Sequence, residues 1–273
     1  MISDYEFPTI GQIWHAQELR GAEVHVVAPE ALEEAIDDRT GVVSVTAVCY
    51  RNGVRLPVEE IARVAHAHGA LVLLDAYQAI GSYPLDVREL GVDALAAGVL
   101  KYLLGSAGLA FLWTRPGLAA ELTPTQTGWF ADEDIFAMDH TDYSPSPSAR
   151  RFQSGTPPIP AIYGGVAGME LMLEIGVAET REHVNALNER LIAGVDELGG
   201  VVVTPREAER RGALVCVRST DAPALVRALA ADGVVTSERD GNLRVSAHAY
   251  NTEEDIDAVV TSLARNRALL HRV

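Results

Sequence analysis

The sequence is poor in cysteine and has no cluster of metal-binding side chains. Its two cysteines, Cys49 and Cys216, each lie within a hydrophobic, strand-like segment. Thiols in such segments belong more often to a core than to a disulfide or a metal pair, so we expect core thiols. Because histidine and cysteine are nowhere grouped at the spacing of metal ligands, the sequence predicts no bound metal.

Basic residues and long apolar runs are also scarce. There are 22 lysines and arginines against 38 aspartates and glutamates, which gives a net charge of -16. Nucleic acids and anionic membranes require a basic face, so neither is expected as a partner. No run approaches the roughly 18 apolar residues that cross a bilayer, and residues 1–6 lack the basic start and the apolar core of a signal peptide. The expected location is cytoplasmic.

Strand-like and helix-like segments alternate along the first part of the chain. At 273 residues and 48% hydrophobic composition, the chain is long enough for a large domain and a smaller one. The βαβ alternation predicts an α/β fold with a mostly parallel central sheet and flanking helices. Strands are expected over residues 22–27, 42–48, 71–75 and 95–100, an antiparallel strand over 107–113, and helices over 29–38 and 57–68.

The second half of the chain is organised differently. Residues 116–160 hold seven prolines, which predicts a long irregular segment with a functional use. One or two helices follow over 161–198, where Gly164, Gly165 and Gly168 indicate close packing. Strands near 201–203, 213–217 and 243–246 and helices over 222–232 and 252–266 then predict a compact module. We therefore expect a large domain, 1–175, and a small C-terminal α+β domain, 176–273.

Asp75 and Lys101 are the most informative pair in the sequence. Asp75 ends the apolar run 71–74, and Lys101 lies 26 residues later, after the apolar run 95–100. Parallel strands end at one sheet edge, where open α/β folds bind ligands. Pyridoxal 5'-phosphate (PLP) requires such a pair, because an amine forms its Schiff base and a carboxylate keeps its ring nitrogen protonated. The alternative is an ordinary strand end and a solvated loop lysine.

Four motifs follow one another along the chain. They are Asp75-x-x-Gln78, Lys101 before Leu104-Gly105-Ser106-Ala107-Gly108, Arg151-Phe152-x-x-Gly155-Thr156-Pro157, and Leu243-Arg244-Val245-Ser246 running into Tyr250-Asn251-Thr252. In order and spacing they resemble the class V aminotransferase family of fold-type I PLP-dependent enzymes. That family includes kynureninases, cysteine desulfurases and isopenicillin epimerase-like proteins. The resemblance covers nearly the whole chain.

The resemblance implies a role for each matching residue. Lys101 bonds to the cofactor and later moves protons at the substrate's alpha carbon. Asp75 pairs with the pyridinium nitrogen, and loss of this pair leaves a buried charge uncompensated. Gln78 donates a hydrogen bond to the ring's phenolic oxygen. Arg244 holds the substrate carboxylate through a bidentate fork, the alternative being a surface arginine on a strand.

Some positions resemble the kynureninase branch of the family in particular. Phe7 stands where the family has the residue that stacks on the PLP ring, although an ordinary core phenylalanine fits as well. Trp129 and Thr156 lie in segments that reach the neighbouring subunit's site in that branch. The resemblance implies that Trp129 contacts the cofactor phosphate there and Thr156 the phosphate or the substrate, in a homodimer with shared active sites. Trp129 is alternatively a packed loop aromatic. His248 is expected to point to a different side from Arg244, as a structural or rim residue.

The sequence departs from the family pattern in three places. The loop before Arg244, residues 235–242, lacks the cysteine on which desulfurases form a persulfide, so desulfurase activity is not expected. Gly98-Val99-Leu100 replaces the serine and histidine, or tyrosine, that often precede the lysine, which weakens the grip on the cofactor phosphate. The family's N-terminal segment, which cradles that phosphate, is expected to be missing through truncation or as a natural short form.

Three functional hypotheses follow from the sequence. The first is a PLP-dependent enzyme acting on an amino-acid substrate by transamination, elimination or kynureninase-like cleavage. The second is a non-catalytic or weakly PLP-binding remnant or accessory subunit that retains the fold. The third is a nucleotide-binding α/β domain, which is disfavoured because the chain has neither a G-x-G-x-x-G motif nor a P-loop.

Overall fold

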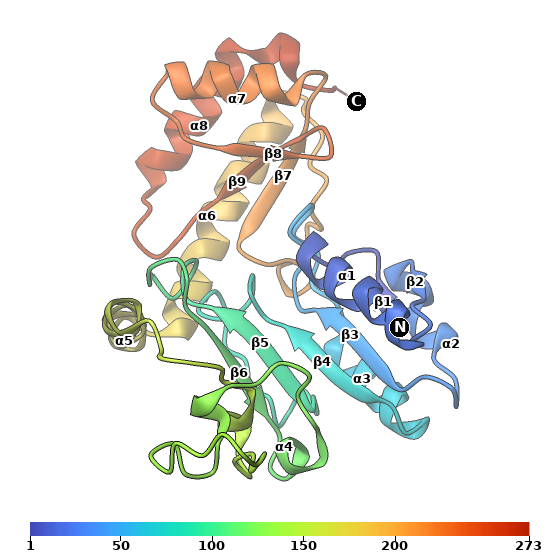
Figure 1. The fold of residues 1–273 in the computed structure, drawn as a ribbon. Helices are drawn as coiled ribbons and strands as arrows, with labels where there is room; N and C mark the ends of the chain where they lie inside the picture. Colours follow the sequence, from blue (N-terminus) through green and yellow to red (C-terminus); the bar gives the residue numbers. More distant parts are fainter. Residues whose placement is uncertain (273) are drawn as a thin grey trace.

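The computed structural model describes residues 1–272, and a six-stranded sheet forms its centre (Figure 1). Five strands run parallel: β1 (Ile2–Ser3), β2 (Val26–Val27), β3 (Val42–Thr46), β4 (Leu71–Asp75) and β5 (Ala94–Gly98). β6 (Ala110–Thr114) pairs antiparallel with β5, and the strand order is β2-β1-β3-β4-β5-β6. The prediction of a mostly parallel sheet with an antiparallel return strand is confirmed.

Helix α3 (Val58–Ala67) illustrates why this part of the chain folds as it does. Four of its apolar residues recur at helical spacing and are buried along one face: Val58, Ile61, Ala62 and Ala65. That face packs on β3 and β4 in the core of the large domain. The other helical segments of residues 1–175 are α1 (Pro8–His15), η1 (Ala16–Arg20), η2 (Pro29–Ala31), α2 (Leu32–Ala35), α4 (Leu118–Glu121), η3 (Trp129–Ala131), η4 (Ala149–Phe152) and α5 (Ile159–Ile175).

A three-stranded antiparallel sheet with its own core lies beyond residue 176. Its strands are β7 (Leu214–Arg218), β8 (Ser237–Arg239) and β9 (Asn242–Ser246), in the order β7-β9-β8. α6 (Val177–Glu197), α7 (Ala222–Ala231) and α8 (Glu253–Arg265) pack on it, with short turns at η5 (Ala208–Arg210) and η6 (Arg267–Leu269). α8 begins at Thr252, which forms a capping box with Asp255.

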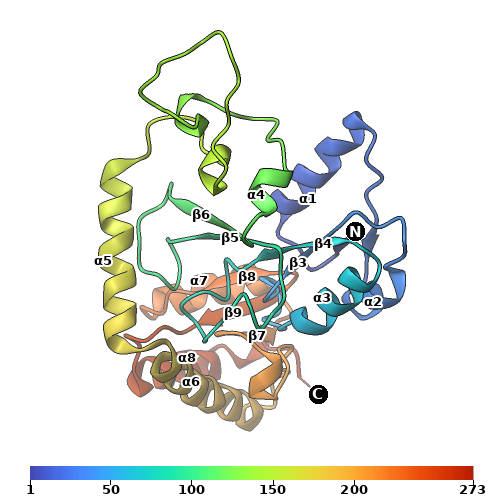
Figure 2. The same cartoon turned by 90° about the horizontal axis from the view of Figure 1, so that it is seen from below.

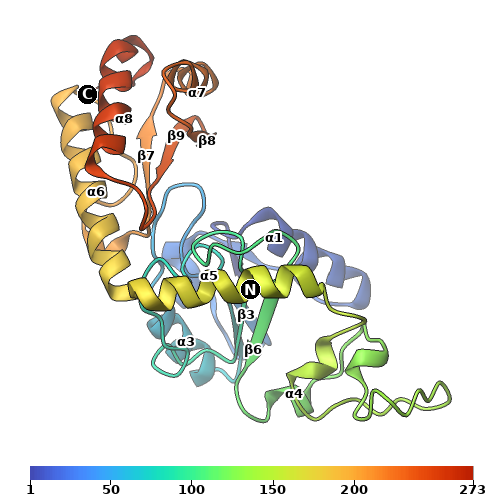
Figure 3. The ribbon, with the colours of Figure 1, turned by 90° about the vertical axis from the view of Figure 1, so that its left-hand side faces the viewer.

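The chain turns sharply between α5 and α6. The two helices are bent by 77° at Gly176, whose φ of 91° favours glycine (Figure 3). One hydrophobic core lies before this bend and another after it, with Tyr102 as the exception that joins the second core. We propose the bend as the domain boundary, at residue 175. No single helix among residues 1–272 is both long and apolar enough to cross a membrane.

Several local expectations differ from the structure. The expected helix over 29–38 is reduced to η2 and α2, because Ile36 turns extended and buries its side chain in the core. The expected strand near 201–203 is only a bridge between Val202 and Val217. α1 and the short edge strand β8 were not expected. Of the segment 116–160 that is expected to be irregular, residues 122–158 are largely so and extend away from the sheet beyond β6 and α4 (Figure 2), whereas residues 118–121 form α4 and α5 begins at Ile159.

The small domain depends on the packing of α6 against its sheet. Leu191 is fully buried in that core, whereas Leu19 of η1 is 94% exposed. We expect Leu191→Ala to lower the free energy of unfolding by about 2–5 kcal/mol through lost burial and the cavity left behind. Urea unfolding followed by circular dichroism measures this. The matched control Leu19→Ala should change it by no more than about 0.5 kcal/mol; equal effects would contradict the assigned core.

Candidate active site

Asp75 and Lys101 leave the central sheet at the same edge. Asp75 is the last residue of β4, and β5 ends at Gly98, shortly before Lys101. The two strands pair parallel, with Asp75 beside Ala96, so both continue toward one side. The Leu104 amide donates to the Lys101 carbonyl at 3.0 Å. Lys101 is therefore held on a tight turn above the sheet, as the sequence predicts.

The turn that carries Lys101 is supported from two sides. Tyr102, the next residue, is buried in the core of the small domain, and its hydroxyl lies 2.9 Å from the Ser246 hydroxyl. On the other side α5 approaches so closely that a Cβ at Gly168 would lie 2.2 Å from the Leu103 carbonyl oxygen. The small residues of α5 therefore allow the close packing that the sequence indicates, and both contacts fix the turn.

A cavity of about 460 Å³ opens between this edge and the small domain. The large domain contributes Phe7, Tyr50, Gln78 and Lys101 to its lining, and β9 contributes Arg244. The remaining lining residues are Leu100, Tyr102, Arg239, Ser246, Ala247, His248 and Tyr250. Four of the predicted site residues, Phe7, Gln78, Lys101 and Arg244, are therefore brought together around one space.

Asp75 is a buried carboxylate close to this cavity. Its side chain accepts a hydrogen bond from the Tyr77 amide at 2.8 Å, and the residue is 7% exposed. Burial raises the pKa of Asp75, while the Tyr77 amide and the positive charge of Lys101 oppose the rise. A further cation beside such a carboxylate stabilises its charged form. A protonated ring nitrogen is a cation of this kind.

Lys101 is the only lysine of the sequence, since all the other permanently charged basic side chains are arginines. Burial lowers the pKa of Lys101 to about 8; the Asp75 carboxylate opposes this change and Arg244 adds to it. Its Nζ lies 4.8 Å from the centroid of the Tyr77 ring. An amine with a pKa near 8 is partly neutral at neutral pH, which makes it a better nucleophile than an exposed lysine.

Tyr77 is a site residue that the sequence analysis did not single out. Its hydroxyl lies directly above Gly98, where a Cβ would approach within 2.0 Å of it. The chain has no serine or histidine just before Lys101, and the Tyr77 ring occupies part of the space there. A glycine in a buried strand indicates that another group approaches the backbone closely. Gly98 is therefore the feature of the sequence from which a side chain at this position could have been predicted.

Phe7 and Arg244 face the cavity from opposite domains. Phe7 is 42% exposed and meets Tyr50 edge to face at 5.0 Å, so it is not an ordinary core phenylalanine. Arg244 is half-buried, and its Nε has no hydrogen-bond partner among residues 1–272. Burial lowers the pKa of Arg244, and Arg239 adds to the lowering. The unpartnered guanidinium leaves donors available for a ligand.

His248 lines the same cavity as Arg244, so the expectation that it points to a different side is wrong. Its ring stacks between Tyr102 and Tyr250, with centroids 5.6 and 4.8 Å away. The backbone turns after Ser246, at the end of β9, and this returns His248 toward the cavity. Burial lowers the pKa of His248. Stacking between two rings agrees with the structural or rim role that the sequence predicts.

Trp129 and Thr156 do not reach the cavity of this chain. Both are exposed, and Trp129 contacts Phe130 edge to face at 4.4 Å. Both lie in the irregular segment beyond β6. Their predicted contacts belong to a neighbouring subunit's site, so these roles stay predictions.

Glu6 is a second buried carboxyl group that the sequence analysis did not single out. Neither oxygen has a hydrogen-bond partner of normal geometry among residues 1–272. Burial and then the charge of Asp75 raise the pKa of Glu6 to about 8, against a smaller opposing effect of the Thr46 amide. A protonated Glu6 adds no charge, which leaves Asp75 as the carboxylate that faces Lys101.

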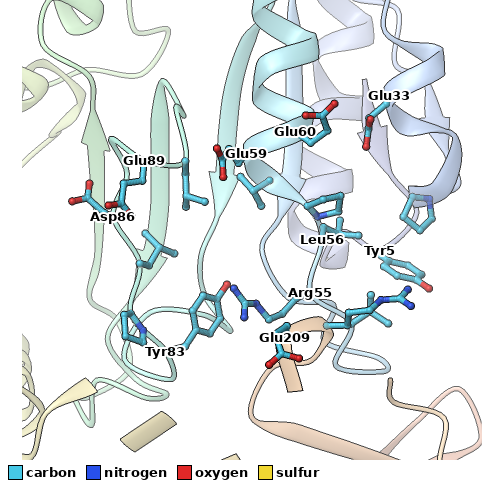
Figure 4. A pocket seen from close by; sticks show the side chains of 18 of the residues that line it. Tyr5, Glu33, Arg55, Leu56, Glu59, Glu60, Tyr83, Asp86, Glu89 and Glu209 are labelled. Atoms are coloured by element: carbon cyan, nitrogen blue, oxygen red, sulfur yellow. The ribbon is translucent and has the colours of Figure 1, made fainter. Parts of the chain in front are cut away.

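A larger cavity of about 880 Å³ lies elsewhere, between α3, the segment 83–90 and η5 (Figure 4). Arg55 points to the ring of Tyr83 there, with its guanidinium carbon 4.0 Å from the ring centroid. Seven carboxylates line this space: Glu30, Glu33, Glu59, Glu60, Asp86, Glu89 and Glu209. Such a surface repels a phosphate or a carboxylate, so the smaller cavity at Lys101 is the candidate active site.

Comparison with known proteins places the chain in a family. Residues 12–259 match the model of the class-V aminotransferases. An uncharacterized aminotransferase of Bacillus subtilis, YcbU, is 33% identical over 96% of this chain and 70% of its own length. A kynureninase of Pseudomonas fluorescens is 31% identical over 79% of this chain and 53% of its own. A probable cysteine desulfurase of Methanothermobacter thermautotrophicus is 30% identical over 87% of this chain and 63% of its own length.

Solved structures share the fold. The apo cysteine desulfurase of Thermococcus onnurineus aligns with a TM-score of 0.86 at 21% identity, over 98% of this chain and 72% of that one. A C-DES variant with glycine covalently linked to its PLP aligns with a TM-score of 0.84 at 24% identity, over 96% of this chain and 73% of that one. The prediction of fold type I is confirmed.

The chain belongs to the class-V aminotransferase family. The predicted enzyme class, a PLP-dependent transferase or lyase, is confirmed at the level of the family. The residues at the cavity also fit PLP, because an amine of lowered pKa and an arginine with an unpartnered Nε line one space, and the buried carboxylate of Asp75 lies close to it. Lys101, Asp75, Gln78 and Phe7 are the residues that would hold the cofactor.

The pKa of Lys101 is directly measurable because the chain has only one lysine. With 13C-labelled lysine, a single Cε signal should titrate near pH 8 in the folded, cofactor-free protein and near 10.5 in denaturant. Asp75→Asn should lower the folded value, because it removes the charge that opposes the shift. Arg244→Gln should raise it. A folded midpoint near 10.5 would show that the amine is not buried.

Proposed function

We propose that the protein is a PLP-dependent enzyme that acts at the alpha carbon of an amino acid. The observation that carries the proposal is the position of the only lysine. Lys101 has a pKa lowered to about 8, follows the strand that pairs with Asp75 at this sheet edge, and shares a cavity with Arg244, whose Nε is unpartnered. An amine, an acid and a carboxylate-binding group are the side chains that this chemistry needs.

Each residue has a distinct task in this proposal. PLP supplies the electron sink that stabilises negative charge at the alpha carbon. Arg244 binds and orients the substrate carboxylate. Lys101, when neutral, accepts the proton from the alpha carbon and then donates it to a different atom of the reacting molecule. Phe7 would stack on the ring of a bound PLP, and Asp75 would hold its ring nitrogen protonated. Gln78 donates to the phenolic oxygen.

Transamination and kynureninase-like cleavage are the reactions we favour over desulfuration. Relatives include probable cysteine desulfurases, so the family alone does not exclude that activity. Both cysteines are fully buried, and burial raises the pKa of Cys216 to about 12. The Cys216 thiol donates to the Arg51 carbonyl at 3.0 Å. Persulfide formation needs an accessible thiolate, and neither cysteine provides one.

The test uses the purified full chain with added PLP. We expect a visible absorbance band that depends on Lys101, and borohydride reduction should place the pyridoxyl mass on the peptide that contains it. Lys101→Arg keeps the charge but removes the primary amine, so this variant should lose the band and at least about 100-fold in turnover. Alanine, aspartate, kynurenine and cysteine are then added, and changes in the band and the products identify the reaction.

The outcomes of that test separate the hypotheses. A pyridoxyl mass on the N-terminal amine would refute the assignment of Lys101. A normal band that no amino acid changes would favour the accessory or remnant protein instead. Rapid release of sulfide or alanine from cysteine would refute the exclusion of a desulfurase.

We also propose a homodimer with shared active sites. α5 leaves a row of apolar side chains exposed, which a monomer would not require. They are Ile159, Tyr163, Val166, Leu171, Leu173 and Ile175. Trp129 and Thr156 lie in the preceding irregular segment, are exposed, and do not line this chain's own cavity. In a symmetric dimer, each subunit's segment would meet the partner in the same way, so that two equal sites would be completed. A cytoplasmic location stays a prediction from the sequence.

Mixed dimers test this arrangement. Lys101→Ala and Thr156→Val are each expected to be inactive alone. Mixing them in equal amounts under exchange should restore about a quarter of the wild-type activity, because half of the dimers are mixed and each has one intact site. Light scattering that shows a stable, cofactor-loaded monomer would contradict the proposal.

A further inference from the structure

The wall that the small domain presents to the cavity is cationic, although the whole chain is strongly acidic. Arg239 and Arg244 both line the cavity at Lys101. Of the cavity-lining residues in the described chain, none is an aspartate or a glutamate. One arginine is enough to hold the carboxylate of an amino acid. The second arginine therefore has no assigned use.

The hairpin formed by β8 and β9 places the two arginines side by side. Arg239 is opposite Asn242, and Ser237 is opposite Arg244. Side chains on opposite residues of antiparallel strands share a face, so Arg239 and Arg244 are diagonal neighbours on one face. Such diagonal neighbours lie about 7–8 Å apart across the two paired strands, within reach of long side chains. Consistently, Arg239 contributes to the lowered pKa of Arg244.

Neither guanidinium is neutralised within residues 1–272. Arg239 donates only to the backbone carbonyl of Glu238, at 2.6 Å, and forms no ion pair there. The acid next to it, Asp240, is instead 3.4 Å from Arg51. Arg244 has an unpartnered Nε and is likewise without an ion pair in that part of the chain. Two adjacent like charges repel each other, and a ligand with two anionic groups would relieve that repulsion.

We propose that Arg239 binds a second, side-chain carboxylate of the substrate, so that the enzyme prefers dicarboxylic amino acids. The inference rests on the proposed function only in taking Arg244 as the group that binds the alpha carboxylate. Arg239 is exposed at the hairpin end, which places it at the outer part of the cavity. A side chain that extends outward from the alpha carbon meets it there.

The experiment compares matched pairs of ligands on the cofactor-loaded protein. L-aspartate and L-glutamate should bind roughly 10- to 100-fold more tightly than L-asparagine and L-glutamine, the range of a charge-assisted hydrogen bond. Affinity is read from the change in the cofactor band. Arg239→Gln should reduce this ratio to about one without altering the affinity for L-alanine. Arg239→Lys should keep part of the preference for dicarboxylic amino acids, because lysine keeps the positive charge but lacks the two parallel N–H donors of a guanidinium.

Arg227→Gln is the control for net charge. Arg227 is exposed on α7 and does not line the cavity, so its loss removes one positive charge at a distance. It should leave the ratio unchanged. If Arg227→Gln lowers the ratio as much as Arg239→Gln does, a general field effect replaces the proposed contact and the inference fails.

Succinate separates this inference from the proposed function, because it has two carboxylates and no amine. Isothermal titration should show succinate binding in the wild type, roughly 10-fold weaker binding in Arg239→Gln, and little binding of acetate. If amino acids fail to change the cofactor band but succinate behaves in this way, the reaction proposal fails and the dicarboxylate site stands. If succinate binds no better than acetate, the site is refuted. Weaker PLP binding in Arg239→Gln, with an unchanged ratio, would assign Arg239 to the cofactor phosphate and overturn the inference.

Discussion

The parallel pairing of β4 with β5 is the constraint on which the candidate site depends. It brings the last residue of one buried strand, Asp75, next to the strand that leads into Lys101. The turn at Lys101 is then held between the two domains, because Tyr102 enters the core of the small domain and α5 packs on Leu103 through Gly168. Since one lysine has to be fixed against both an acid and a ligand, this support is as important as the sheet register.

The electrostatics of the site follow from burial and from a local balance of charge. Burial raises the pKa of Asp75 and Glu6 and lowers that of Lys101, so each group is pushed toward its neutral form. An incoming cofactor and substrate would bring a ring cation for Asp75 and a carboxylate for Arg244. The cavity is therefore arranged for charged ligands rather than for stability alone, which agrees with the general observation that perturbed groups gather at functional sites.

Much of this arrangement was predictable from the sequence, and the failures have physical causes. The apolar segments that alternate with helical patterns predict the parallel sheet, because buried parallel strands are continuous apolar runs. The acid or lysine at the end of such a run predicts the positions of Asp75 and Lys101. Tyr77 was missed because its position over Gly98 depends on two strands at once. His248 lines the cavity with Arg244, contrary to the sequence-based expectation. Side chains alternate between the two faces of a sheet only within a strand, and β9 ends at Ser246, so the pattern does not extend to His248. The short edge strand β8 follows from pairing with β9, which no local pattern shows.

The position of β8 and β9 also bears on how one fold serves several reactions. The segment before Arg244 holds no cysteine, and its hairpin presents Arg239 to the cavity instead. Cys216 lies on β7 directly beside Arg244, yet the sheet buries it and raises its pKa to about 12. Proximity to Arg244 alone therefore does not make a reactive thiol. Under the proposed function, the chemistry of PLP would be common to the family, and the side chains of the hairpin at the cavity wall would select which substrate groups are bound.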